Sequence, residues 1–386
     1  MKVSKRLKEI PPYLFAEIDR KIEEKRERGV DVISFGVGDP DLPTPSQIVK
    51  VLQREAENPN NHRYPSYQGM PLFREAVSSW LRERFGLDFD PEREIIALLG
   101  TKEGLFHCPL AFMDQGDTAL VPDPAYPVYG RAVHFCNASQ VRFPLKEEDG
   151  FLPDLSAIPE DTWLKTEMIF LNYPNNPTTA VADLSFFDEI VEYSHRYDFI
   201  IVHDAAYSEI TYDGYVSPSL LQVAGAKDTS LEFHSLSKTC NMTGWRIGFA
   251  AGGADLIESF GKIKTNIDSG VFNAVQHAAI SALENSRDIA ADNCRIYQRR
   301  RDLLIEALRD VGWRVTPPKA TLYVWMSVPG GYDSASFARE LLEEADIVVV
   351  PGSAYGEYGE GFVRFSLTLP DQRLEEGVRR IREAFS

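Results

Sequence analysis

Residues 235–248 place a lysine among residue types that bind phosphate. The segment reads Ser-Leu-Ser-Lys-Thr-Cys-Asn-Met-Thr-Gly-Trp-Arg-Ile-Gly. The amine of Lys238 can form an imine with a carbonyl compound, and neighbouring groups tune how readily it does so. Ser235, Ser237 and Arg246 could supply two hydroxyl donors and a bidentate guanidinium to one phosphate. Most single lysines are surface residues, and Ser-x-Ser-Lys alone is a weak signal, but Gly-x-Arg-x-Gly at this distance strengthens it. The segment predicts covalent capture of a carbonyl cofactor that carries a phosphate.

A second phosphate-binding element is predicted at Thr101 and Lys102. Residues 100–104 read Gly-Thr-Lys-Glu-Gly, follow the apolar run 95–99 and open a helical stretch. The N-terminus of a helix binds phosphate through its backbone N–H groups. A plain strand-to-helix turn is the alternative interpretation of this segment.

Two polar residues follow the apolar run 199–202. Asp204 stands at the expected carboxyl end of a parallel strand, where α/β proteins bind ligands. A carboxylate there can pair with a pyridine nitrogen, keep it protonated and make the ring an electron sink, while Tyr207 could donate to a ring phenolate oxygen. A lone aspartate is more often a helix cap. Together with the amine and the phosphate-binding groups, however, Asp204 points to pyridoxal 5′-phosphate.

Three further residues could contact a flat cofactor or its substrate. Residues 172–178 read Asn-Tyr-Pro-Asn-Asn-Pro-Thr, and the two prolines could hold the amide of Asn176 toward a ligand, although such clusters are usually simple turns. Tyr126 follows another apolar run and could lay its ring on the cofactor. Arg364 lies inside the apolar segment 362–366 and needs a carboxylate, either from a substrate or from an internal salt bridge.

The elements that must position these residues form a repeating pattern. Short apolar runs separated by amphipathic stretches are typical of buried parallel strands with crossover helices. We therefore expect an α/β fold with a large domain over residues 41–285, built as a three-layer sandwich around a mostly parallel central sheet. The runs are 32–35, 95–99, 118–121, 168–171, 199–202, 231–233 and 247–251.

The pattern changes after residue 285. A long helical stretch over 287–311 leads into shorter strands near 322–326, 347–350 and 362–367 and a final helix from residue 372. This order predicts a smaller α+β domain over residues 286–386. The N-terminal segment, residues 1–40, is expected to pack with it and to contain a helix between Pro12 and Gly29.

Composition narrows the classes of function. The 386 residues carry 41 basic and 58 acidic side chains, a formal charge of −17, which opposes non-specific binding to nucleic acid or to an anionic membrane. The N-terminus is charged and resembles neither a secretory signal nor a membrane anchor, so we expect a cytoplasmic protein. Four cysteines without a Cys-x-x-Cys spacing predict reduced, structural thiols and no metal site.

Taken in order, these motifs resemble the fold-type I pyridoxal-phosphate enzymes, specifically the class I/II aminotransferases, over essentially the whole chain. The set comprises residues 36–41 (Gly-Val-Gly-Asp-Pro-Asp), 64–69 (Tyr-Pro-Ser-Tyr-Gln-Gly) and 100–102, Tyr126, 176–177, Asp204, Tyr207, 235–238, Arg246 and Arg364. The resemblance implies an aspartate-aminotransferase-like fold, pyridoxal 5′-phosphate as cofactor, and amino acids and 2-oxo acids as substrates.

The resemblance also implies a role for each residue. Lys238 would bond to the cofactor and move a proton from the substrate α-carbon, and Asp204 would hold the ring nitrogen. The other ring contacts would come from Tyr126, Asn176 and Tyr207. The phosphate would be held by Thr101, Lys102, Ser235, Ser237 and Arg246. The substrate α-carboxylate would be held by Arg364 and the Gly38 amide.

In this family a tyrosine from the neighbouring subunit also reaches the phosphate. Tyr64 is the first choice for it, and Tyr67 is the second, because residues 64–69 offer both. A site built from two chains implies an obligate homodimer.

Within the family, residues 10–15, 36–45 and 101–104 most resemble the LL-diaminopimelate aminotransferases. That subgroup transfers an amino group between LL-2,6-diaminopimelate and 2-oxoglutarate, giving tetrahydrodipicolinate and glutamate in lysine biosynthesis. Tyr13, Lys102, Tyr126 and Asn176 would then contact the substrate. Tyr67 stands where members of the subgroup carry a glutamate for the distal ammonium.

Other activities on the same scaffold stay open. Aspartate aminotransferases use an arginine from the partner subunit, but residues 265–286 contain none. The alternatives are an aminotransferase for another amino acid (aspartate, alanine, methionine or an aromatic one), a β-lyase, or a pyridoxal-phosphate-binding transcription regulator. The regulator would need a basic DNA-binding domain before the aminotransferase-like part, and we expect none.

Overall fold

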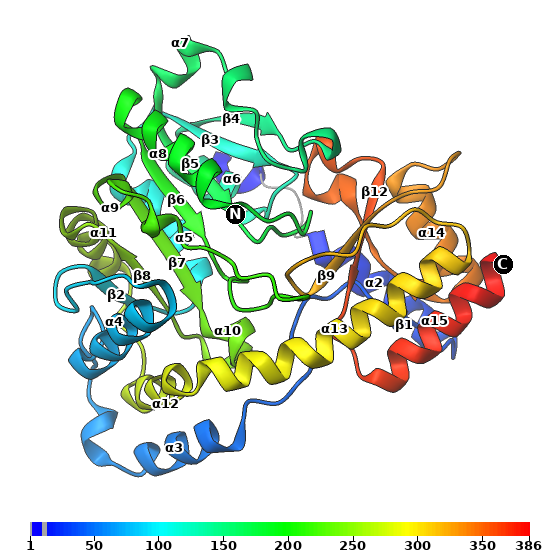
Figure 1. Ribbon diagram of the computed structural model, residues 1–386, viewed down its shortest axis with the longest axis horizontal. Helices are drawn as coiled ribbons and strands as arrows, with labels where there is room; N and C mark the ends of the chain where they lie inside the picture. The colour runs from blue at the N-terminus through cyan, green and yellow to red at the C-terminus, as the bar shows by residue number, and fades with distance from the viewer. Residues whose placement is uncertain (1, 10–13) are drawn as a thin grey trace.

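A seven-stranded sheet forms the centre of the computed structural model, which describes residues 2–9 and 14–386 (Figure 1). In spatial order its strands are β2 (Ile95–Leu98), β8 (Gly248–Gly252), β7 (Ser230–Ser235), β6 (Ile200–Asp204), β5 (Thr166–Asn172), β3 (Thr118–Asp123) and β4 (Ser139–Pro144). Only β8 runs antiparallel to its neighbours within this sheet. The expected α/β class with a mostly parallel central sheet is confirmed.

Helices cover both faces of the sheet, because its strand residues alternate between two apolar cores. Ile95 and Ala97 of β2 belong to the first core, whereas Ile96 and Leu98 belong to the second. The first core is covered by α3 (Ser46–Ala56), α4 (Pro71–Phe85), α8 (Leu184–Tyr197) and α12 (Asn273–Glu284). The second is covered by α5 (Thr101–Phe112), α6 (Val128–Phe135) and α11 (Ala254–Ile267). Burial on both faces explains why the strands read as continuous apolar runs.

The structure differs from the pattern of apolar runs at two strands. Strand β4 was missed because it is an edge strand whose residues are mostly exposed, so its sequence, Ser-Gln-Val-Arg-Phe-Pro, has no apolar run. The run 32–35 lies outside the large sheet: it contributes β1 (Ile33–Ser34), which pairs in parallel with β10 (Ile347–Val348).

A second lobe contains the C-terminal elements (Figure 1). Its antiparallel sheet has the order β11 (Val350–Pro351), β12 (Phe362–Ser366) and β9 (Tyr323–Ser327). Helices α14 (Ser334–Ala345) and α15 (Asp371–Phe385) pack around it. The long helix α13 (Ser286–Asp310) runs from α12 to α15 and so connects the two lobes (Figure 1). The N-terminal helix α2 (Leu14–Glu27) lies on the side of this second lobe, where Ile22 packs against Leu342.

The remaining helices are short. The α-helices among them are α1 (Lys5–Lys8), α7 (Glu160–Trp163), α9 (Ala226–Thr229) and α10 (Leu236–Thr239). The 3₁₀ helices are η1 (Pro59–His62), η2 (Glu147–Asp149), η3 (Leu155–Ala157), η4 (Leu220–Gln222), η5 (Thr243–Trp245), η6 (Gly352–Tyr355) and η7 (Glu357–Gly359).

One carboxylate is fully buried in the large sheet. Glu232 of β7 accepts hydrogen bonds from His203 Nδ1 at 2.9 Å and His234 Nε2 at 2.7 Å, and also from the Ser219 hydroxyl. Burial tends to raise the pKa of Glu232, but the two histidine hydrogen bonds hold it well below its ordinary value. The group is therefore a structural ion cluster within the sheet.

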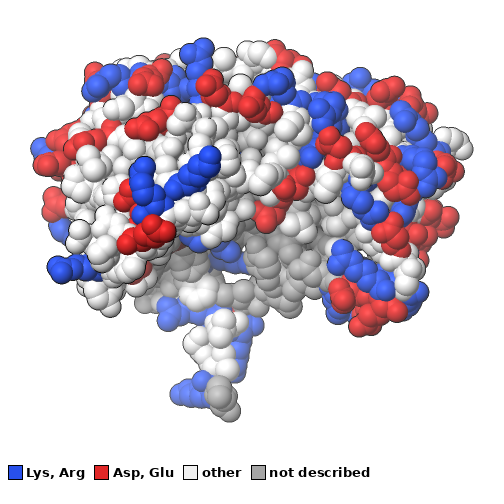
Figure 2. Space-filling view, turned by 90° about the horizontal axis from the view of Figure 1, so that it is seen from below, with Lys and Arg blue, Asp and Glu red and all other residues white. Residues whose placement is uncertain are grey.

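The surface carries charges of both signs. Figure 2 shows acidic and basic side chains interspersed over the face that it presents. All four cysteines are free thiols. Among residues 2–9 and 14–386, no helix has the length and apolarity that crossing a membrane requires.

Candidate active site

A cavity of about 690 Å³ lies between the two lobes at the carboxyl ends of the large sheet's parallel strands. Three neighbouring strands end in polar residues there, since β5 ends at Asn172, β6 at Asp204 and β7 at Ser235. The predicted site residues that line the cavity are Gly38, Thr101, Lys102, Tyr126, Asn176, Asp204, Tyr207, Ser235, Ser237, Lys238, Arg246 and Arg364. The fold therefore brings together residues that are spread over more than 300 positions of the sequence.

Lys238 projects into this cavity from the short helix α10, which directly follows β7. Its ammonium nitrogen Nζ donates a hydrogen bond to the Gly38 carbonyl at 2.8 Å. Burial lowers the pKa of Lys238, and although Tyr323 and Asp39 oppose this, the net shift is downward. A lowered pKa increases the fraction of neutral amine, which is the nucleophilic form.

Asp204 lies at the base of the cavity with its carboxylate buried. Its Oδ2 accepts a hydrogen bond from the Tyr129 hydroxyl at 2.8 Å, and its Oδ1 accepts one from the Ala206 amide at 3.3 Å. Burial raises the pKa of Asp204, whereas the hydrogen bond from Tyr129 lowers it. A buried carboxylate held by two neutral donors is suited to pair with a cation, such as a protonated ring nitrogen.

The phosphate corner, which is the part of the cavity predicted to hold the phosphate, lies where β2 meets α5. Gly100 is the N-cap of α5 with φ +80°, and as a glycine it offers no side-chain cap to the first turn. Arg246 lies against this turn: its Nη2 donates to the Leu99 carbonyl at 3.2 Å, and a Cβ on Gly100 would clash with that Nη2. Burial and the charges of Arg131 and Arg246 lower the pKa of Lys102. Uncapped N–H groups and converging cations fit a phosphate dianion.

Arg364 is held rigidly in β12 with 1% of its surface exposed. Its Nη1 donates to Asn176 Oδ1 at 2.8 Å and its Nη2 to the Gly36 carbonyl at 2.9 Å, while the guanidinium carbon lies 4.0 Å from the centre of the Tyr323 ring. Both partners are neutral oxygens, and within the described chain the buried Nε has no hydrogen-bond partner. The internal salt bridge is therefore not formed among the described residues, and the guanidinium fits a ligand carboxylate.

Several lining residues were not found from the sequence. Tyr323 of β9 donates to or accepts from the Tyr207 hydroxyl at 2.9 Å, and its ring faces Arg364. Its position follows from the pairing of Tyr323 with Ser366 between two remote strands, for which the sequence has no local signal. Asn172 could have been found, since it ends the strand before the loop of Asn176, and its Nδ2 donates to the Asp204 carbonyl at 2.7 Å. The others are Val37, Asp39, Ala206, Thr243 and Tyr355, whereas Gly244, which also lines the cavity, belongs to the predicted Gly-x-Arg-x-Gly motif.

Two predicted contacts do not line this cavity. Tyr64 is 87% exposed and Tyr67 47% exposed, and neither lines the cavity of its own chain. They are the first and second choices for the one tyrosine that contacts a partner subunit's phosphate, and this assignment stays a prediction. Tyr13 lies outside the residues that the structure describes.

The cavity combines a lysine and a buried carboxylate from the carboxyl end of the large sheet with a buried arginine from β12, in the fold of the aspartate-aminotransferase-like transferases. Residues 30–381 match the model of the family "Aminotransferase class I and II". The chain belongs to this family, whose members generally depend on pyridoxal phosphate.

Known proteins resemble the chain over its full length. An "LL-diaminopimelate aminotransferase" of Moorella thermoacetica is 53% identical over 382 residues, which cover 99% of this chain and 98% of that protein. Among solved structures, substrate-bound BacF of Bacillus subtilis has a TM-score of 0.95 at 34% identity and covers 99% of this chain and 98% of its own. A mutant aspartate aminotransferase of Thermus thermophilus has a TM-score of 0.91 at 30% identity and covers all of both chains.

Proposed function

We propose that this protein is a pyridoxal-phosphate-dependent LL-diaminopimelate aminotransferase. It transfers an amino group between LL-2,6-diaminopimelate and 2-oxoglutarate, giving tetrahydrodipicolinate and glutamate in lysine biosynthesis. The observation that carries the substrate assignment is the 53% identity, over 99% of the chain, to a relative of that name. The class of reaction rests independently on the cavity that joins Lys238, Asp204 and Arg364.

Each part of the cavity has a distinct task in this proposal. When bound, pyridoxal phosphate supplies an electron sink for the negative charge that develops at the substrate α-carbon. Asp204 keeps the ring nitrogen protonated, and Tyr207 and Asn176 hold the ring oxygen. Lys238 would hold the cofactor covalently through its Nζ, and the same amine would take the proton from the substrate α-carbon.

The phosphate is assigned to the corner formed by the first turn of α5 and the segment after β7. Thr101, Lys102, Ser235, Ser237 and Arg246 all line this part of the cavity. Because the phosphate does not react, these residues contribute binding and orientation, which set the ring's position relative to Lys238. Tyr126 is assigned to the face of the ring.

Arg364 is assigned to the α-carboxylate, which both the amino donor and the 2-oxo acceptor possess. A planar guanidinium can form two parallel hydrogen bonds to that group. Its contacts with Asn176 and Gly36 fix the guanidinium before a substrate arrives, so less conformational entropy is lost on binding. Gly38 lies beside Lys238 and provides the second α-carboxylate contact, through its amide.

We also propose that the protein is a cytoplasmic homodimer in which each active site contains residues of both subunits. The exposed Tyr64 and Tyr67 fit a role in contacting the phosphate of a partner subunit. Tyr64→Phe should weaken cofactor binding if Tyr64 is the residue that makes this contact, and Tyr67→Phe should do so if Tyr67 makes it. Sedimentation velocity tests the dimer itself, and a monomer that retains full activity would refute the shared site.

The substrate is tested by mixing the enzyme with single amino acids and following the visible absorbance of the bound cofactor. The panel contains LL- and meso-diaminopimelate, aspartate, alanine, methionine and tyrosine. Rapid loss of the absorbance with the LL isomer alone supports the proposal. A faster reaction with aspartate or another amino acid would assign the enzyme to that substrate instead.

Lys238→Ala tests the chemistry separately from the substrate. Borohydride reduction should attach the cofactor covalently to the wild-type enzyme and not to this variant. If the variant still forms a reducible bond, Lys238 is not the cofactor lysine.

A further inference from the structure

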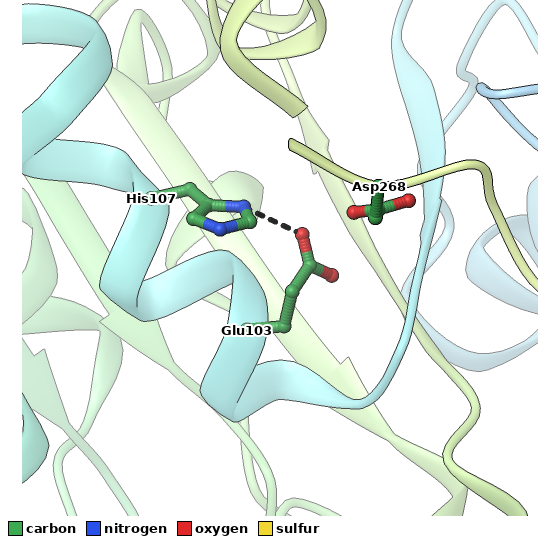
Figure 3. A group of neighbouring side chains, drawn as sticks. All are labelled: Glu103, His107 and Asp268. Atoms are coloured by element: carbon green, nitrogen blue, oxygen red, sulfur yellow. Dashed lines mark ion pairs between the residues drawn. The ribbon is translucent and has the colours of Figure 1, made fainter. Parts of the chain in front are cut away.

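Four ionisable side chains meet behind the phosphate corner, outside the cavity. Glu103 and His107 lie one turn apart on α5 and point toward each other, and Asp268 faces them from the segment after α11 (Figure 3). His107 Nδ1 lies 2.7 Å from Glu103 Oε1. Lys264 of α11 completes the group, with Nζ 2.7 Å from both carboxylate oxygens of Asp268 and 3.6 Å from Glu103 Oε1.

The position of Lys264 decides what this cluster does. Two carboxylates and a histidine so close together could hold a metal ion, but the Lys264 ammonium already occupies the place between the carboxylates, and its side chain is fully buried. A buried ammonium is stable only when such partners surround it. The cluster is therefore a fixed ion network that orients Glu103.

The other oxygen of Glu103 connects the network with the phosphate corner. Glu103 Oε2 accepts a hydrogen bond from the Leu99 backbone amide at 3.0 Å. The Leu99 carbonyl accepts the 3.2 Å hydrogen bond from Arg246 Nη2. The backbone of Leu99 is thus held at its N–H by Glu103 and at its carbonyl by Arg246, which belongs to the predicted phosphate site.

We propose that Glu103 is a positioning residue for the phosphate-binding corner and that His107 and Lys264 hold its carboxylate in place. It acts through Leu99, whose orientation sets both the guanidinium of Arg246 and the Gly100 turn that begins α5. This inference rests on the proposed function, because the corner's ligand is taken to be the phosphate of pyridoxal phosphate.

Two substitutions separate positioning from general stability. Glu103→Ala removes the acceptor of the Leu99 amide, and we expect about tenfold weaker binding of pyridoxal phosphate. Glu103→Gln keeps an oxygen acceptor of the same reach, so it should restore most of the affinity. The matched control is Glu258→Ala on α11, since Glu258 also pairs with a lysine, Lys262 at 2.9 Å, but both side chains are exposed.

Two measurements are made on each purified variant: the dissociation constant for pyridoxal phosphate, from a titration of the cofactor-free protein, and the melting temperature without cofactor. Weaker binding by Glu103→Ala, with recovery in Glu103→Gln and no change in the control, supports the proposal. A lower melting temperature with unchanged affinity would show a purely structural role and overturn it, as would a glutamine variant no better than alanine.

If Glu103→Ala does not fold, His107→Asn decides the question, because it removes the shorter of the two contacts of Glu103 Oε1 and leaves the Leu99 contact of Oε2 in place. An unchanged dissociation constant in that variant overturns the proposal, and a weakened one supports it. Wild-type protein that binds no pyridoxal phosphate would refute the proposed function itself, and so the two failures are distinguishable.

Discussion

Replacing Arg364 with lysine tests the substrate-binding geometry most directly, because it retains the positive charge and changes its shape. The guanidinium is fixed by hydrogen bonds to Asn176 and Gly36 and lies 4.0 Å from the centre of the Tyr323 ring. Lysine has one ammonium in place of the planar fork, so it cannot keep these contacts and also form two parallel bonds to a carboxylate.

The size of the effect follows from the contacts that are lost. One hydrogen bond to a charged group contributes about 1.5–3 kcal/mol, and stacking of a guanidinium on an aromatic ring about 0.5–1 kcal/mol. Their sum is about 2–4 kcal/mol. At about 1.4 kcal/mol for each factor of ten, kcat/KM should fall by about 30- to 700-fold.

The assay is steady-state kinetics with at least three amino donors and 2-oxoglutarate. The α-carboxylate is common to all of these substrates, so kcat/KM should fall by a similar factor for each, mainly through KM. Arg301→Lys is the matched control: Arg301 is also buried, lies 4.9 Å from the centre of the Tyr212 ring and pairs with Asp213, but does not line the cavity. It should lower the melting temperature without changing KM.

A decrease in kcat/KM for only one amino donor would refute this reasoning, because it would place Arg364 at a side-chain group of that substrate. Equal kinetics for the wild type and Arg364→Lys would remove the residue from the site altogether.

Three further predictions concern buried groups. Tyr129→Phe removes the hydrogen bond that lowers the pKa of Asp204, so the pKa of Asp204 should rise. We expect kcat to fall about tenfold, and the acid limb of the pH–rate profile should move to higher pH. Glu232→Gln should cost about 3–5 kcal/mol of unfolding free energy at pH 7, because the two histidines lose their buried anion. Since the pKa of Glu232 is lower in the folded than in the unfolded protein, the wild-type advantage should diminish as the pH falls below 4.5 in urea titrations. Burial raises the pKa of the Cys240 thiol to about 12, so this thiol should react with a disulfide reagent at pH 8 only after unfolding.

Much of the site could be predicted because its residues stand in short motifs directly after apolar strands. Asn176, Asp204 and Lys238 each follow a run whose burial on both faces makes it recognisable in the sequence. Parallel strands place their carboxyl ends at one edge of the sheet, so residues far apart in sequence are brought together by the strand pattern alone. The edge strand β4 lacked this signal, because its exposed residues are not constrained to be apolar.

Other features depended on the tertiary structure. The contact of Tyr323 with Arg364 follows from the register between β9 and β12, and the bond from Tyr129 to Asp204 joins a helix to a strand 75 residues away. The sequence by itself predicted the family and the positions of Asn176, Asp204 and Lys238 after buried strands, because these are local patterns. Only the tertiary structure decided which neutral groups orient Asp204 and Arg364, because side-chain contacts between remote elements depend on how those elements pack.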